Sequence, residues 1–317
     1  MRYSMNCFSF YFGLLTLIAT PAMNSAHSQI SNSTPASKAL EPNARLERIG
    51  SGFKFTEGPV WTPQNDLLFS DIPKNTIFRW NNGKTEIYRT PSYNSNGLTF
   101  DAQGRLLACE HGSRRVSCEE SDGTIRVLAE TYNGKKLNSP NDLVVKSDGA
   151  IYFTDPPYGI KSEQEEQGFY GIYRIAPDGA LTLLDKTLRR PNGLAFSPDE
   201  KRLYVNDSEE NNIYAFNVQS DGAISNKRIL VNVNAPGLSG AADGMKVNVN
   251  GEIVTSAPGG VCVISPDGKI VERISVPETT TNVAFGERDR KTLFITAGST
   301  VYRIRMKTPG LPLPYRK

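Results

Sequence analysis

Histidine and cysteine are scarce in this sequence, and their scarcity excludes several classes of site. Of the 317 residues only two are histidines and four are cysteines, and His27 and Cys7 lie within the first 28 residues. The other cysteines, Cys109, Cys118 and Cys262, have neither the spacing of a zinc site nor the density of a disulfide framework. One remaining histidine, His111, and the lack of a G-x-S-x-G phrase speak against a serine triad. HExxH, Walker and dinucleotide-binding motifs are also missing.

Long runs of one charge are absent as well. The chain has 36 Lys and Arg against 33 Asp and Glu, a formal net charge of +3, and no segment rich in Lys or Arg. Nucleic acid and anionic membrane surfaces are therefore not expected partners. With 38% hydrophobic and 22% charged residues, the composition is typical of a globular protein with a sizeable core.

Only one hydrophobic run suggests a targeting segment. Residues 8–19 (FSFYFGLLTLIA) follow Arg2 and are too few to span a membrane. We interpret residues 1–28 as a secretory signal peptide, cleaved after Ser28 or earlier at Ala22, and expect a periplasmic or extracellular protein. A buried or disordered N-terminus is the alternative. Residues 29–44, polar and rich in proline and serine, are predicted to form a flexible lead-in.

Export would place the cysteines in an oxidising compartment. Cys109 and Cys118 flank a predicted hairpin turn at residues 112–114, so they are candidates for a disulfide across it. Two free thiols are the alternative, which the spacing alone does not exclude.

A short phrase recurs six times along the chain. The copies are EGPVW (57–61), NGLTF (96–100), NDLVV (141–145), NGLAF (192–196), DGMKV (243–247) and NVAF (282–285). Each copy precedes a turn, a second apolar run and a third strand, and five units continue through a glycine turn to a fourth strand. Four short strands in units of about 40 to 50 residues are the signature of a β-propeller.

The predicted fold is therefore an all-β, six-bladed propeller over residues 45–306, with a C-terminal tail at 307–317. The sixth unit lacks a fourth strand before the chain ends, and residues 45–49 (RLERI) supply it. Pairing strands from both ends of the chain in the last blade closes the ring and leaves no open edge.

One polar position opens each copy of the phrase. The residues at this position are Glu57, Asn96, Asn141, Asn192, Asp243 and Asn282. Because the first strand of each blade lines the central channel, these six oxygen-bearing side chains are expected to form a ring. Asn and Asp also favour strand starts by bonding to nearby backbone, but that reading explains six copies poorly and Glu57 not at all. Oxygen ligands with two carboxylates suit a hard divalent cation, Ca²⁺ above all, with Mn²⁺, Mg²⁺ or Zn²⁺ as alternatives.

The loops between second and third strands are predicted to lie at the same end of the channel as this ring. The longest is DPPYGIKSEQEEQGF, from residue 155 to 169. His111, Asp155, Tyr158 and Asp207 are its neighbours or members and are candidate pocket residues, with a solvated loop position as the alternative for each.

Long phrases resemble a known family. EGPVW, SNGLTFDAQGRLLACEHGSRRV, LNSPNDLVVKSDGAIYFTDPPYG, PNGLAFSPDEKRLYVND and ADGMKV are similar to the bacterial branch of the gluconolactonase/regucalcin/luciferin-regenerating-enzyme family, over roughly residues 45–305. The resemblance implies a six-bladed propeller with a divalent cation, often calcium, held by Glu57, Asn141, Asn192 and Asp243. Asn96 and Asn282 are then channel-wall or substrate contacts. Where regucalcin-type members carry an arginine, this chain has Ser139, which favours the bacterial gluconolactonase branch.

The resemblance implies metal-dependent hydrolysis of a sugar lactone, with D-glucono-1,5-lactone as the expected substrate. A channel cation would polarise the carbonyl and bring water to it, and the general base would be Asp243, less favourably Glu57, or His111. The expected substrate contacts are Asn96, Asn141, Asn192, Asp155, Tyr158 and Asn282. An organophosphate hydrolase using the same metal site and a non-catalytic ligand-binding propeller are the alternatives. We expect a monomer or small homo-oligomer.

Overall fold

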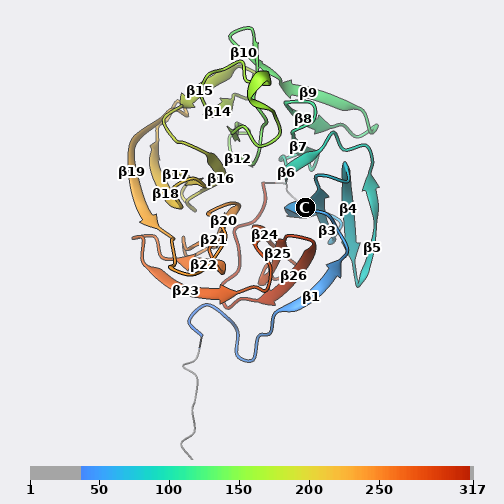
Figure 1. The fold of residues 1–317 in the computed structure, drawn as a ribbon, viewed down its shortest axis with the longest axis vertical. Helices are drawn as coiled ribbons and strands as arrows, with labels where there is room; N and C mark the ends of the chain where they lie inside the picture. Colours follow the sequence, from blue (N-terminus) through green and yellow to red (C-terminus); the bar gives the residue numbers. More distant parts are fainter. Residues whose placement is uncertain (1–36, 315–317) are drawn as a thin grey trace, which may run out of the picture. The chain divides into compact units, whose positions relative to one another are not determined.

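The computed structural model describes residues 37–314 and confirms the all-β, six-bladed propeller. Six four-stranded antiparallel sheets surround a central axis (Figure 1), and a two-stranded hairpin is added to them. The predicted signal peptide, residues 29–36 of the predicted lead-in and residues 315–317 lie outside the described residues. Among residues 37–314, no helix is long and apolar enough to cross a membrane.

Each sheet is one blade, and the blades are numbered 1 to 6 in chain order. Blades 1 and 2 contain β2 (Thr56–Trp61), β3 (Leu67–Asp71), β4 (Thr76–Asn81), β5 (Lys84–Arg89), β6 (Ser95–Phe100), β7 (Leu106–Glu110), β8 (Arg115–Glu119) and β9 (Ile125–Ala129). Blades 3 and 4 contain β12 (Leu143–Val145), β13 (Ile151–Asp155), β14 (Gly171–Ile175), β15 (Leu181–Asp185), β16 (Pro191–Phe196), β17 (Arg202–Asp207), β18 (Asn212–Val218) and β19 (Ile224–Asn232). Blade 5 contains β20 (Met245–Val247), β21 (Ile253–Ala257), β22 (Gly260–Ile264) and β23 (Ile270–Ser275). Blade 6 combines β1 (Glu47–Ser51) with β24 (Thr280–Gly286), β25 (Thr292–Ala297) and β26 (Thr300–Arg305).

The second strands are buried on both faces because every blade packs between two neighbours. In β13, Phe153 packs into the core cluster shared with blade 2, whereas Tyr152 packs into the cluster shared with blade 4. Both side chains are fully buried. Such strands have apolar residues on consecutive positions instead of alternating ones, which explains phrases such as IYFTD.

The N-terminal strand closes the ring as predicted. β1 pairs antiparallel with β26, and Leu40 forms a further bridge with Met306. Ala39 is buried in the core cluster of blades 5 and 6, so the part of the predicted lead-in from residue 37 onward packs against the propeller. Burial of apolar side chains from the N-terminal segment therefore supports the closure that strand pairing makes.

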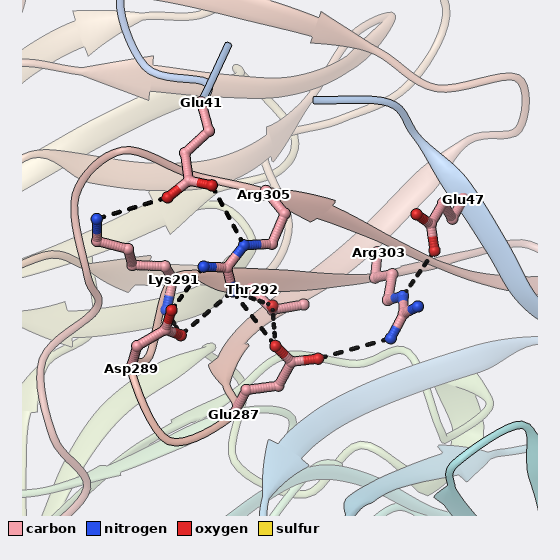
Figure 2. Close-up of polar contacts among 8 residues, drawn as sticks. All are labelled: Glu41, Glu47, Glu287, Asp289, Lys291, Thr292, Arg303 and Arg305. Carbon is pink, nitrogen blue, oxygen red and sulfur yellow. Dashed lines mark hydrogen bonds and ion pairs between the residues drawn. The ribbon is translucent and has the colours of Figure 1, made fainter. Parts of the chain in front are cut away.

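Ion pairs add to this closure on the exposed side of blade 6 (Figure 2). The Arg305 guanidinium lies 2.5 Å from Asp289, 3.3 Å from Glu287 and 3.5 Å from Glu41 of the N-terminal segment. Arg303 bonds Glu47 of β1 at 2.8 Å and pairs with Glu287 at 3.5 Å. The network joins the two ends of the chain, although each pair is partly exposed to solvent and individually weak.

We expect Arg305→Ala to lower the free energy of unfolding by about 1 kcal/mol at low salt, because it removes several partly exposed contacts at once. In a protein of this size this corresponds to a fall in melting temperature of about 2 °C. Thermal melts at low salt and in 1 M NaCl test the effect, which salt should reduce. Lys269→Ala, which removes an exposed pair with Asp267 inside one turn, is the control. An equal loss in both variants, or no salt dependence, would contradict the role of the network.

Of the two alternatives left open for Cys109 and Cys118, the structure has free thiols, and both are buried. The register of β7 and β8 places Cys109 opposite Val116 and Cys118 opposite Leu107. The two thiols are therefore diagonal neighbours in one core cluster instead of a directly facing pair.

Two local features were not predicted. A small hairpin, β10 (Thr131–Tyr132) with β11 (Lys135–Lys136), follows blade 2. The long loop after β13 contains a short 3-10 helix, η1 (Ser162–Gln164). Gln167 holds this loop by donating to the backbone carbonyls of Tyr132, Lys135 and Lys136, so hairpin and loop support each other.

Candidate active site in the central channel

The six ring positions lie on the inner strands, which contact one another around the axis. Glu57, Asn96, Asn192 and Asn282 belong to β2, β6, β16 and β24, whereas Asn141 and Asp243 lie two positions before the first residues of β12 and β20. Five of them are buried, at most 4% exposed, whereas Asp243 is half-buried. The ring that the repeat predicted is therefore assembled from all six blades.

Polar residues of the second strands hold the ring backbone in place. Ser70 Oγ of blade 1 donates to the Asn96 carbonyl at 2.9 Å, and Thr154 Oγ1 of blade 3 donates to that of Asn192 at 2.8 Å. These bonds run from one blade to the next, so the packing of neighbouring blades sets the position of each ring residue.

Glycine follows the ring residue in four of the six blades because the inner strands approach closely. A Cβ on Gly58 would lie 2.0 Å from the Asn96 carbonyl oxygen, and one on Gly193 would lie 2.2 Å from that of Asp243. A Cβ on Gly244 would lie 1.9 Å from Cγ of Asn282. Substituting these glycines would force the inner strands apart.

Glu57 and Asp243 are the two carboxylates of the ring. Burial raises the pKa of Glu57 to about 7, and the neighbouring carboxylate of Asp142 adds to the rise. Burial also raises the pKa of Asp243 well above its ordinary value, with further contributions from Glu57 and Asp142. The carboxylates thus lie close enough to repel one another in a site from which water is largely excluded.

The ring amides differ in their contacts. Asn192 Nδ2 donates to Ser208 Oγ at 3.0 Å and also contacts Asp243. Asn96 Nδ2 lies 3.2 Å from Nε2 of His111. The amide nitrogen can only donate, so the imidazole Nε2 is the acceptor and the proton of the neutral imidazole lies on Nδ1. Asn141 is 4% exposed, and among residues 37–314 its side chain has no hydrogen-bond partner in the protein. An oxygen ligand for a cation is therefore available there.

Asn282 is turned differently. Its Oδ1 accepts from the Val283 backbone nitrogen at 2.8 Å, and its Nδ2 donates to Glu57 at 3.0 Å and to Asp142 at 3.3 Å. The amide oxygen is occupied by its own strand and the amino group by two carboxylates. This arrangement speaks against the predicted contact between Asn282 and substrate.

His111 lies at the wall of the channel beside Asn96. Burial lowers its pKa to about 4, so the imidazole is neutral at physiological pH. Gly159 of the long loop covers it, since a Cβ there would lie 2.5 Å from Cβ of His111. A weakly basic ring whose Nε2 already accepts from Asn96 is a poorer general base than Asp243.

Tyr158 from the same loop lies over the ring at this mouth. Burial raises the pKa of its hydroxyl, while contacts of the hydroxyl with Ser208 and Asn192 oppose the rise, and Asp243 is near enough to add to it. The Arg190 guanidinium stacks 5.7 Å from the centre of the Tyr158 ring. Ser208, which sequence reasoning did not single out, donates to the Ala242 carbonyl at 2.7 Å and joins this group.

Asp155 and Asp207 hold loop backbone instead of facing the channel. Asp155 is fully buried and accepts from the Asn138 backbone nitrogen at 2.8 Å, while Asp207 accepts from Arg189 and Arg190 at 2.8 and 3.2 Å. Asp71 makes the same contacts with Lys54 and Phe55. The shared geometry identifies these residues as loop anchors and speaks against the predicted substrate contact of Asp155 and the pocket position of Asp207.

Two charged residues of the inner strands were missed. Asp142 follows Asn141, at the position that is glycine in four other blades, and it is 2% exposed. Lys246 lies three positions after Asp243, and the equivalent residues are Val60, Thr99, Val144, Ala195 and Phe285. Lys246 and its five equivalents line a cavity of about 800 Å³ at the second mouth of the channel. The departures from the repeat were visible in the sequence and are the signal that would have found both residues.

The donor set fits a hard divalent cation better than a soft one. Glu57 and Asp243 supply two carboxylates that form no ion pair with any residue from 37 to 314, and Asn141 and Asn192 add amide groups. No group of three or more His, Cys, Asp or Glu within residues 37–314 is arranged as metal ligands. Carboxylate and amide oxygens are ligands that calcium takes, whereas softer metals favour His and Cys.

Comparison with known proteins agrees with this architecture. A family model described as the SMP-30/gluconolactonase/LRE-like region matches residues 55–299. The gluconolactonase of Zymomonas mobilis is 37% identical over 299 residues, 86% of this chain and 84% of that protein. A gluconolactonase structure from Xanthomonas campestris is 34% identical with a TM-score of 0.77, covering 86% of this chain and 99% of that one. A calcium-binding regucalcin from Agrobacterium tumefaciens, 18% identical, shares the fold with a TM-score of 0.74 over 86% of this chain and 97% of its own. The chain therefore belongs to the SMP-30/gluconolactonase/luciferin-regenerating-enzyme family.

Proposed function

We propose that this protein hydrolyses a sugar lactone, with D-glucono-1,5-lactone as the first substrate to test, in the channel beneath Tyr158. The observation that carries the proposal is the pair of neighbouring carboxylates, Glu57 and Asp243, among channel amides in a chain 37% identical to a gluconolactonase. At the level of enzyme class, the chain is a carboxylic-ester hydrolase of the lactonase type, as its bacterial relatives are.

The residues that would hold a divalent cation are Glu57, Asn141, Asn192 and Asp243. Their oxygens match calcium, and the family includes calcium-binding regucalcin. When bound, such a cation polarises the lactone carbonyl and lowers the pKa of a nearby water. Its charge would also return both carboxylates to their ionised forms, which burial alone disfavours.

In the proposed reaction, Asp243 takes a proton from the attacking water as the new carbon–oxygen bond forms. The ring C–O bond of the lactone then breaks, and the ring oxygen leaves as a hydroxyl after receiving the proton that Asp243 took from the water. Tyr158, beside Asn192 and Ser208, and Asn96, beside His111, are placed to hold sugar hydroxyls through hydrogen bonds. His111 orients Asn96 in this scheme, because its Nε2 holds the Asn96 amino group.

The test follows acid release from D-glucono-1,5-lactone with a pH indicator, after subtraction of spontaneous hydrolysis. We expect chelation to lower the rate by at least about a hundredfold and calcium to restore it, because the carbonyl would lose its Lewis acid. Activity that survives exhaustive chelation would overturn the cation. A folded protein that binds calcium but hydrolyses no aldonolactone would overturn the substrate class, and an organophosphate panel would then be the next assay.

A further inference from the structure

Beneath the ring, the two charged residues that depart from the repeat are electrostatically linked. Asp142 stands where four other blades have glycine, and Lys246 replaces small or apolar residues. The pKa of Asp142 is raised chiefly by burial, and Lys246 opposes that rise more than any other group. Lys246 also acts on Glu57 in the same direction. Lys246 lines the cavity at the second mouth of the channel, and its ammonium donates to the Met245 carbonyl at 2.9 Å.

The space for Asp142 comes from a glycine of the preceding blade. A Cβ on Gly97 would lie 2.6 Å from Oδ1 of Asp142, and the Gly97 backbone nitrogen donates to the Asn141 carbonyl at 2.8 Å. Asp142 Oδ1 accepts from the Leu143 backbone nitrogen at 2.9 Å. The carboxylate is therefore fixed by its own strand, and its second oxygen is directed at Asn282.

Asn282 joins Asp142 to Glu57. The Asn282 amino group, Nδ2, donates to Glu57 Oε2 at 3.0 Å and to Asp142 Oδ2 at 3.3 Å. Asn282 cannot rotate its amide to offer the oxygen instead, because Oδ1 already accepts from Val283 and a flip would place donor against donor. The close approach of Gly244 also holds the Asn282 side chain in place. The Glu57 carboxylate is thereby held by two donors, the Gly58 backbone nitrogen at 2.6 Å and Asn282.

We propose that Asp142 is a positioning residue of the cation site, which orients Glu57 through the Asn282 amide and whose charge Lys246 balances from below. The inference rests on the proposed cation. It assigns Asn282 to the support of a ligand, and it makes the inner carboxylate a third negative charge felt by the ion. Opposite charges in a poorly solvated channel interact strongly.

The experiment is calorimetric titration of calcium into the chelator-treated full-length protein. Asp142→Asn is expected to weaken calcium binding by about tenfold or more, since it removes a charge and sets an amino group against either Leu143 or Asn282. Asn282→Ala leaves every charge in place but should weaken binding to a similar extent. The double variant should bind calcium about as well as the weaker-binding single variant, because both substitutions break the same chain of contacts.

Lys246→Met is expected to tighten calcium binding by about threefold or more, because a positive charge is removed from below the ion. Thr99→Val, at the same level of the channel but without a charge change, is the matched control and should bind calcium like the wild type. Melting temperatures of the chelator-treated variants separate loss of folding from loss of affinity.

The outcomes separate the two proposals. A wild-type protein that binds no calcium overturns the cation site itself. Wild-type affinity in Asp142→Asn overturns the inference alone, and additive losses in the double variant overturn the route through Asn282. Weaker binding in Lys246→Met would overturn the charge balance assigned to that residue.

Discussion

Replacing Asp243 with asparagine is expected to lower kcat/KM for lactone hydrolysis by at least about a thousandfold in the presence of calcium. The substitution removes both the proposed proton acceptor and one of the two ring charges, while keeping the size of the side chain. The fold should persist, because the Asp243 backbone is held independently by Ser256 Oγ and by the Gly193 nitrogen. Initial rates at saturating calcium, with circular dichroism on the same sample, measure the effect.

Asp207→Asn is the matched control for this variant. Asp207 is buried, but its carboxylate accepts backbone bonds from Arg189 and Arg190. We expect this variant to melt at a lower temperature and to keep its turnover per folded molecule. Normal turnover in Asp243→Asn would refute the assignment of Asp243 as the base, and an equal loss in both variants would indicate a general effect of burying an amide.

Calcium should stabilise the protein more at pH 8 than at pH 5, by an additional amount of about 3 kcal/mol from Glu57 alone. Burial raises the pKa of Glu57 from 4.5 to about 7, so the chelated folded state binds its proton more tightly than the unfolded state does. This contribution to stability is fully present below pH 4.5 and is lost as the pH rises through 7. Asp243, whose pKa is raised as well, changes stability in the same direction.

Calcium binds the ionised carboxylates, so its binding offsets the stability that the chelated protein loses as the pH rises. The measurement is the difference in melting temperature between calcium and chelator at steps from pH 5 to 8, because groups far from the channel cancel in that difference. Glu57→Gln should flatten the chelated protein's pH dependence and remove most of the calcium effect. A calcium effect that is the same at pH 5 and pH 8 would contradict the ligation of the ring carboxylates.

Much of the fold was predictable because each blade repeats the same local information. The phrase from EGPVW to NVAF marks the inner strands, and glycine turns mark the hairpins, so the blade number followed from counting copies. The ring was predictable for the same reason, since equivalent positions of a repeat occupy equivalent positions around the axis. The pairing of β1 with β26 followed from the strand missing at the end of the sixth unit.

The predictions that the structure corrects depended on where a side chain points. Asp155 and Asp207 begin loops at the ring end of the channel, but their carboxylates turn back to loop backbone. Cys109 and Cys118 flank a turn, but the strand register sets other residues opposite each of them. Asp142 was not predicted, because the repeat assigns only the first polar position of NDLVV to the channel. The close approach of Gly97 shows that the second position also lies inside it.

The sequence by itself determined the six-bladed architecture, its closure by both ends of the chain and the composition of the ring. These properties follow from the sequence repeat, and a repeat can be recognised from the amino-acid sequence alone. Only the tertiary structure decided that Asn282 serves Glu57 and Asp142, that His111 lies neutral beside Asn96, and that Tyr158 covers the mouth. Each of those contacts joins residues from different blades or loops, and its distance and direction depend on how the blades pack around the axis.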